Sequence, residues 1–217
     1  MLSLIFPPRC ALCHGFLQRN ETDLCHKCRT DTPELIHSKR KIPFVAKWTA
    51  LWYYKDNVRN SLHRYKFRNV RGYADIYARL LSRKILEAEL TEGVDMITWS
   101  PISLRRKFHR GYDQSHLLAK ALSRELGIPL VKTLQKARHT KTQSLIKDAS
   151  ARRANIHGAY RIIDPKIIAG KRILLLDDIL TTGATASECA RILMTGGAKE
   201  IYFAAIATAN HDNSKNR

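Results

Sequence analysis

The feature that most constrains the fold of this 217-residue chain is a strand-turn-helix pattern near its C-terminal end. Four aliphatic residues, Ile173 to Leu176, predict a buried strand over 171–178, and Asp177 and Asp178 close it. Small and polar residues then open a helix predicted over 184–194. Since ligands bind at such strand ends in open α/β sheets, we expect a binding site there.

The turn between this strand and helix has the chemistry of a phosphate site. Backbone N–H groups at a helix N-terminus bind phosphate, threonine hydroxyls add donors, and Gly183 lets the main chain approach closely. The two carboxylates can accept hydrogen bonds from sugar hydroxyls or hold Mg²⁺ through water. A capped turn without a ligand is the alternative, but it leaves two carboxylates unpaired after four aliphatic residues, which is unfavourable. The predicted binding residues are Asp177, Asp178, Thr181, Thr182, Gly183, Ala184 and Thr185.

The rest of the chain alternates strand and helix patterns. Asp56 is expected to cap a helix whose apolar face holds Val58, Leu62 and Tyr65. Further helices are predicted over 73–86 and 113–126, and strands over 48–54, 94–100, 130–135, 159–163 and 200–207. Such alternation over about 170 residues predicts an α/β fold, with a parallel sheet covered by helices on both faces.

Four of the five cysteines form two Cys-x2-Cys pairs, Cys10 with Cys13 and Cys25 with Cys28. Four thiolates at this spacing can converge on one tetrahedral Zn²⁺. The alternative of disulfides needs an oxidising compartment that nothing else supports, and a redox-active pair needs a βαβ pattern that is absent here. Because about 30 residues cannot bury a sufficient core, the metal would supply most of the folding energy of a scaffold module. We expect a zinc module over 1–37 and a second domain over 38–217.

The composition, with 44% hydrophobic and 26% charged residues, excludes a disordered chain. Lys and Arg number 38 against 19 Asp and Glu, so the net charge of +19 favours phosphate-bearing partners. The longest apolar stretches are too short to cross a bilayer, which predicts no membrane insertion. The first eight residues lack the basic and apolar regions of a secretory signal, so we expect a cytoplasmic protein.

One cluster of cations is interleaved with aromatic rings. Lys66, Arg68 and Arg71 lie among Tyr65 and Phe67. This mixture suits single-stranded nucleic acid, because bases stack on rings while cations neutralise the backbone. A helix end with ordinary solvated cations is the alternative.

The stretch from Ile173 to Thr185 resembles the phosphoribosyl-pyrophosphate signature of type I phosphoribosyltransferases throughout its length. Three further segments, at 100–106, 109–115 and 138–160, together with the four-cysteine module, make nearly the whole chain similar to the ComF family. Two departures are visible, Trp99-Ser100-Pro101 in place of Pro-Val-Pro and Asp113 in place of Asn. The resemblance implies a phosphoribosyltransferase-like domain, a site for phosphoribosyl pyrophosphate with Mg²⁺, and a role in DNA uptake with other competence proteins.

The resemblance also assigns roles to residues outside the signature. Residues 101–106 would form a pyrophosphate loop with Arg105 and Arg106 as cationic partners, unless this is only a solvated basic loop. Arg110, Asp113 and Gln114 lie at the start of the following helix. The alternative is that Asp113 or Ser115 is no more than the N-cap of this helix. The segment 137–157 would be a lid over the substrate, because long polar connections in α/β domains are commonly active-site lids. Its candidate residues are Arg138, Thr140, Gln143, Arg152 and Asn155.

Three functions fit these patterns. The first is a phosphoribosyltransferase in which Asp177 and Asp178 are the catalytic residues. The second is a non-catalytic module that binds single-stranded DNA and senses a phosphorylated ribose. The third is an adaptor whose zinc module docks another protein. Fold and pocket alone do not establish turnover.

Overall fold

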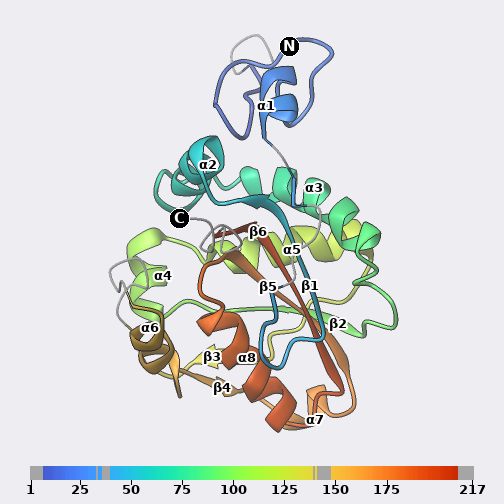
Figure 1. Ribbon diagram of the computed structural model, residues 1–217, viewed down its shortest axis with the longest axis vertical. Coiled ribbons are helices and arrows are strands. Elements are labelled where there is room, and N and C mark those ends of the chain that lie inside the picture. Colours follow the sequence, from blue (N-terminus) through green and yellow to red (C-terminus); the bar gives the residue numbers. More distant parts are fainter. Residues whose placement is uncertain (1–6, 33, 36–39, 139, 141–147, 210–217) are drawn as a thin grey trace, which may run out of the picture.

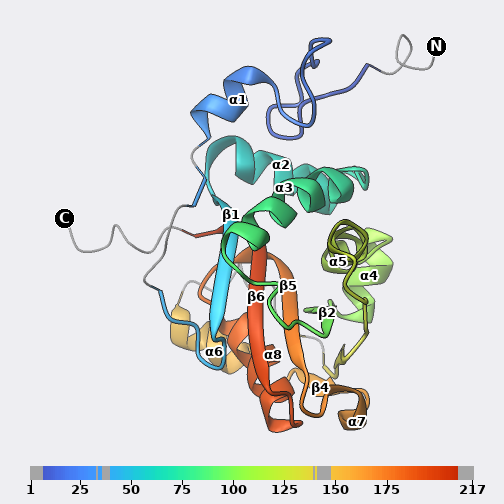
Figure 2. The same ribbon diagram turned by 90° about the vertical axis from the view of Figure 1, so that its right-hand side faces the viewer.

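The computed structural model describes residues 7–32, 34–35, 40–138, 140 and 148–209. Figures 1 and 2 show a small N-terminal module above a sheet that is flanked by helices. The strands are β1 (Lys47–Tyr53), β2 (Met96–Trp99), β3 (Leu134–Lys136), β4 (Tyr160–Ile162), β5 (Arg172–Leu180) and β6 (Glu200–Thr208). The helices are α1 (His26–Asp31), α2 (Asp56–Phe67), α3 (Tyr73–Glu87), α4 (Leu104–Arg110), α5 (Gln114–Leu126), α6 (Ala149–Ile156), α7 (Pro165–Ile168) and α8 (Ala184–Thr195).

The main sheet has the strand order β1-β6-β5-β2, and all its pairs are parallel. Strand β5 therefore lies in the interior of the sheet, between β6 and β2. The short strands β3 and β4 form a separate antiparallel pair. The strand predicted over 130–135 is thus only partly right, because Leu130 makes a single parallel bridge to Ile97 before the chain leaves the sheet for β3.

Helices cover both faces of the main sheet, as the alternating pattern predicted. Figure 2 shows α3 and α5 on one face and α8, with α6 beside it, on the other. Side chains of β5 alternate accordingly, with Leu174 and Leu176 in the cluster under α3 and α5, and Ile173 and Leu175 in the cluster under α8. The predicted α/β class is confirmed. In the described part of the chain, no helix has the length and apolar character needed to span a bilayer.

Helix α5 follows its sequence signals closely. The Asp113 carboxylate accepts from the backbone N–H groups of Ser115 and His116, and Gly127 ends the helix with φ 67°. The N-cap role predicted as one alternative for Asp113 is confirmed. The predicted cap at Asp56 is wrong, because Lys55 occupies the N-cap of α2 without a side-chain hydrogen bond and Asp56 lies in the first turn.

Two helices lie where loops were predicted. Helix α4 occupies part of the expected pyrophosphate loop, and α6 occupies the second half of the expected lid segment. Helix α4 buries no residue, so it has no apolar periodicity to reveal it in the sequence. Its ends are fixed instead by Ser103, whose hydroxyl accepts from the backbone N–H of Arg106, and by Gly111, which adopts φ 76°.

The N-terminal module brings the four predicted cysteine sulfurs together. The sulfurs of Cys10, Cys13, Cys25 and Cys28 all lie within 4.8 Å of one another, and Cys13 Sγ is 3.7 Å from Cys25 Sγ. Tetrahedral zinc with bonds of about 2.3 Å separates its sulfurs by roughly 3.8 Å, so the residues fit this metal. Burial raises the pKa of the Cys10 thiol, but backbone hydrogen bonds from Cys25, Cys13 and Leu12 outweigh it and lower the value to about 7.

The module packs on α2 and α3 through polar contacts. The Ser61 hydroxyl donates to the Ala11 carbonyl, and the Arg64 guanidinium donates to the Leu12 carbonyl. Arg79 on α3 forms a bidentate ion pair with Asp23. These contacts attach the metal-binding loops to two helices of the larger domain. The domain boundary predicted between 37 and 38 falls outside the described residues.

Substitution of one ligand cysteine tests the zinc site. Cys13→Ser should reduce bound zinc well below one ion per chain and lower the free energy of unfolding, because three thiolates hold the metal less tightly than four. Metal analysis of freshly purified protein and chemical denaturation measure both effects.

The matched control is Cys189→Ala, since Cys189 is a free, fully buried cysteine in α8. This variant should keep one zinc per chain. Full zinc occupancy in Cys13→Ser would contradict the assignment.

Candidate functional site

A cavity of about 250 Å³ lies at the carboxyl end of β5. Its walls come from the end of α2, the α4–α5 region, β3, β4 and the turn into α8, so segments far apart in the sequence meet there. The polar residues that line it are Tyr54, Lys66, Ser100, Arg106, Arg110, Gln114, Lys136, Tyr160, Asp177, Asp178, Thr181 and Thr185. The predicted acidic pair and two of the predicted threonines therefore face one cavity.

The acidic pair at the end of β5 is held by hydrogen bonds from α5 and from its own backbone. Asp177 Oδ1 accepts from the Ser115 hydroxyl at 3.0 Å and from the Asp178 backbone N–H at 2.8 Å. Desolvation, together with the negative charge of Asp178, raises the pKa of Asp177 to about 7. The site thus holds one carboxyl group that changes its charge near neutral pH.

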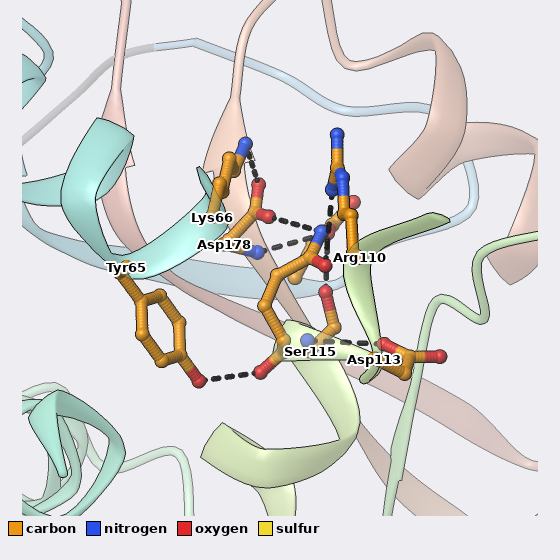
Figure 3. A network of polar contacts seen from close by, with 8 residues as sticks. Tyr65, Lys66, Arg110, Asp113, Ser115 and Asp178 are labelled. Carbon is orange, nitrogen blue, oxygen red and sulfur yellow. Dashed lines mark hydrogen bonds and ion pairs between the residues drawn. The ribbon is translucent and has the colours of Figure 1, made fainter. Parts of the chain in front are cut away.

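Asp178 is engaged from both sides (Figure 3). Its Oδ1 forms an ion pair with Lys66 Nζ at 2.8 Å, and its Oδ2 accepts from Gln114 Nε2 at 2.8 Å. Gln114 is held in turn, because its backbone carbonyl accepts from the Tyr65 hydroxyl and its Oε1 accepts from Arg110. Helices α2, α4 and α5 are therefore connected through this one carboxylate.

Asp113 has a structural role beside the cavity. Besides capping α5, its Oδ2 accepts from Trp99 Nε1 at 3.3 Å and from the Ile102 backbone N–H at 3.2 Å. Its burial raises the pKa against the effect of these donors. Asp113 thus fixes the segment between β2 and α4 against the start of α5.

Two further cations face the cavity from other elements. Arg106 on α4 donates to the Thr140 carbonyl at 2.8 Å. Lys136 on β3 lies 4.8 Å from the ring centre of Tyr160 and donates to its hydroxyl at 3.1 Å. Desolvation, and then the positive charge of Arg106, lower the pKa of Lys136 to about 8. An anionic ligand would favour the charged form of this lysine.

The turn before α8 is closely packed at Gly183. Gly183 is the N-cap of α8 with φ 80°, and a Cβ atom built on it would lie 3.0 Å from an Arg40 guanidinium nitrogen. The chain that connects the two domains therefore brings a cation to this turn. Thr181 and Thr185 line the cavity, whereas Thr182 Oγ1 accepts from the Ala184 backbone N–H within the turn.

The remaining predicted site residues differ in whether they reach the cavity. Arg106 lines the cavity, but Arg105 is exposed and does not line it. Of the lid candidates, Arg138 donates to the carbonyls of Asn155 and His157, which closes the base of the segment. Thr140 is buried and contacts Arg106, and Arg152 lies on α6. Gln143 falls outside the described residues.

The sequence did not assign Lys66, Lys136 or Tyr160 to the binding site. Of these three, only Lys66 stands out in the sequence, as part of a basic cluster. Each reaches the cavity through tertiary packing of a different element, so no local pattern marks it. A lysine beside an aromatic residue on a predicted element is too common a signal to identify a site.

Asp177 provides a pH test of this arrangement. A carboxyl group whose pKa rises from 3.8 to about 7 on folding opposes folding increasingly as the pH rises between these values. Asp177→Asn removes this effect, so the variant should be more stable than the wild type at pH 8, by up to about 4 kcal/mol, and similar to it at pH 4. Urea denaturation at both pH values measures the difference.

Asp178→Asn is the contrasting variant. It leaves the Lys66 ammonium without its partner and should lower stability at pH 8. If Asp177→Asn is no more stable than the wild type at pH 8, the raised pKa is wrong.

Comparison with known proteins matches both parts of the chain. Residues 113–217 match the phosphoribosyl transferase domain family, and residues 1–40 match the double zinc ribbon domain family. The chain is 28% identical to Competence protein F of Haemophilus influenzae over 223 residues, which covers 93% of this chain and 97% of that protein. It is 24% identical to Competence protein ComFC of Bacillus subtilis over 207 residues, which covers 87% and 78% respectively.

A shorter match involves a protein with a different name. The chain is 34% identical to the DNA utilization protein YhgH of Escherichia coli O157:H7 over 144 residues. This match covers 64% of the chain and 62% of that protein, which is less than two thirds of its length. The relatives that align along most of the chain are competence proteins of one type, and the two domain families occur in the predicted order. The chain is therefore similar along most of its length to these competence proteins, in agreement with the resemblance seen in its sequence.

Proposed function

We propose that the cavity binds phosphoribosyl pyrophosphate with Mg²⁺ and that the protein is a phosphoribosyltransferase that acts in DNA uptake. One observation carries this proposal: a phosphate-binding turn and an acidic pair share a cavity whose other charged walls are cations. The names of the relatives, competence proteins and a DNA utilization protein, support the biological role. The four-thiol module suits a reducing compartment, which favours the cytoplasm.

The lining residues suggest an orientation for the ligand. The 5-phosphate would bind the turn before α8, where backbone N–H groups, Thr181 and Thr185 offer donors. The ribose hydroxyls would donate to Asp177 and Asp178. The pyrophosphate would then extend toward the cations on α4 and β3, which are Arg106, Arg110 and Lys136.

The donor set is compatible with Mg²⁺, which prefers carboxylate, phosphate and water oxygens. Asp177 and Asp178 would hold the ion mainly through water and ligand oxygens, because protein donors already bind both carboxylates. When bound, Mg²⁺ neutralises charge on the pyrophosphate and favours its departure.

In the proposed reaction, the bond between the anomeric carbon and the pyrophosphate oxygen breaks, and its electron pair leaves with pyrophosphate. A nucleophile such as a base nitrogen forms the new bond at that carbon and gives up its proton to solvent or to the departing pyrophosphate. Positive charge develops on the sugar at this point, and the carboxylates of Asp177 and Asp178 would stabilise it. Arg106, Arg110 and Lys136 would stabilise the leaving group. The contribution of the protein is thus positioning and electrostatics.

As the surface for single-stranded DNA we propose a group of exposed residues beside the cavity. It consists of exposed residues of α4 and of the last turns of α2, here called the basic-aromatic surface: His63, Phe67, Leu104, Arg105, Lys107 and Phe108. Phe108 is 93% exposed and Phe67 is 54% exposed. The Arg110 guanidinium lies 4.7 Å from the Phe67 ring centre and joins this surface to the cavity. Exposed rings among cations suit stacked bases and a phosphate backbone.

Calorimetry with phosphoribosyl pyrophosphate tests the cavity. The wild type should bind it in the presence of Mg²⁺, and the Asp177→Asn, Asp178→Asn double variant should lose at least about tenfold in affinity, because the amides keep the shape but not the charge. Thr185→Val should weaken binding by about 1–3 kcal/mol through loss of a hydrogen bond to a charged group.

Thr195→Val is the matched control, since Thr195 is exposed at the opposite end of α8 and does not line the cavity, and its affinity should remain near that of the wild type. Unchanged affinity of the double variant would refute the site. Release of pyrophosphate with bases, nucleosides or DNA tests the chemistry. Binding without release from any acceptor would favour the sensing module over the enzyme.

Phe108→Ala tests the DNA surface. It should weaken binding of a short single-stranded oligonucleotide by about 1–3 kcal/mol, because one base loses its stacking partner. Phe16→Ala, which removes an exposed ring from the zinc module, should have little effect. Fluorescence anisotropy across a salt series measures both. Equal losses in the two variants, or equal competition by polyphosphate, would indicate general charge attraction instead.

A further inference from the structure

Lys66 occupies an unusual position for a surface helix residue. It lies in the last turn of α2, and its side chain is only 17% exposed where it meets Asp178, which is 7% exposed. Both residues line the cavity. Since both side chains are mostly buried, the attraction between them is screened less than in a surface ion pair. The acidic pair therefore carries a counter-ion that belongs to the protein.

This counter-ion leaves room for a ligand at Asp178. A carboxylate offers about four lone-pair sites, and the Asp178 carboxylate contacts Lys66 at Oδ1 and Gln114 at Oδ2. A lysine ammonium has three N–H donors, so Lys66 can bind Asp178 and a ligand oxygen together. Sugar hydroxyls can thus reach Asp178 without removing the ion pair.

The balance of charges around the cavity also favours a ligand with one phosphate group. The charged lining residues are four cations, Lys66, Arg106, Arg110 and Lys136, and two carboxylates. This balance matches the charge of one phosphate group, which approaches two negative charges near neutral pH. A pyrophosphate on the same ribose adds further negative charge, which these side chains do not balance.

We propose that Lys66 takes the place of a divalent cation at the acidic pair, so that the site binds a 5-phosphorylated ribose without Mg²⁺ and requires Mg²⁺ only for ligands that also carry pyrophosphate. This inference rests on the proposed function of the cavity. Its ligand class is the ribose 5-phosphates, which include ribose 5-phosphate itself and the 5′-phosphate end of a nucleotide. The site would therefore also bind a phosphorylated ribose that carries no pyrophosphate.

Calorimetry of the full-length protein with two probes tests this inference. Ribose 5-phosphate should bind the wild type with affinities that differ by less than about threefold between Mg²⁺ and EDTA, whereas phosphoribosyl pyrophosphate should lose at least about tenfold in EDTA. Lys66→Met should lose at least about tenfold in affinity for ribose 5-phosphate in EDTA and should regain a large part of it when Mg²⁺ is added. A purely structural lysine would not produce this metal rescue.

Two variants serve as controls. Lys66→Arg keeps the positive charge and should retain more of the affinity for ribose 5-phosphate in EDTA than Lys66→Met does. Arg59→Gln removes a cation from an exposed position on the same helix and should also leave both affinities unchanged. Denaturation curves establish that each variant is folded, and the wild-type comparison of the two probes needs no variant at all.

The outcomes separate this inference from the proposed function. If the wild type binds phosphoribosyl pyrophosphate with Mg²⁺ but needs Mg²⁺ equally for ribose 5-phosphate, the role of Lys66 is refuted and the cavity assignment stands. A folded Lys66→Met that binds like the wild type, or that loses affinity without rescue by Mg²⁺, refutes it as well. If the wild type binds neither probe, the proposed function itself fails.

Discussion

The structure depends on how two adjacent carboxylates are accommodated at the end of a buried strand. An unpaired buried charge is strongly unfavourable, so β5 can carry Asp177 and Asp178 only if other elements supply donors and a cation. Helix α5 supplies Ser115 and Gln114, and α2 supplies Lys66. The placement of α2 and α5 against the carboxyl end of the sheet is therefore tied to the same residues that make the cavity acidic on one wall.

Helix α2 has a second attachment, which explains how a zinc module can affect a site that it does not line. Ser61 and Arg64 bind carbonyls of the metal-binding loops, and the next two residues of the helix, Tyr65 and Lys66, bind Gln114 and Asp178. A helix is stiff over such a short length. Because the module is too small to fold without its metal, zinc contributes to the position of α2 rather than to the chemistry.

Local patterns in the sequence predicted the elements and residues that depend on local physics. The aliphatic run before Asp177, the glycine turn before α8, the cap at Asp113 and the four cysteines all have fixed spacing, and the structure has them as predicted. The partners of the acidic pair could not be predicted, since Gln114 and Asp178 are 64 residues apart. Arg105 was placed with Arg106 because a loop was expected, but in a helix residues i and i+4 share a face, which brings Arg106 and Arg110 to the cavity.

Helix α4 contributes residues both to the cavity and to the basic-aromatic surface. Arg106 and Arg110 line the cavity, whereas Leu104 and Phe108 are exposed. Since α4 buries no residue, hydrophobic packing contributes little to holding it, and its caps and the bonds from Arg106 to Thr140 and from Arg110 to Gln114 must do so. A ligand that binds these two guanidiniums therefore acts on the helix that presents Phe108. By thermodynamic reciprocity, a nucleic acid strand that orders α4 from outside would favour the cavity ligand to the same extent.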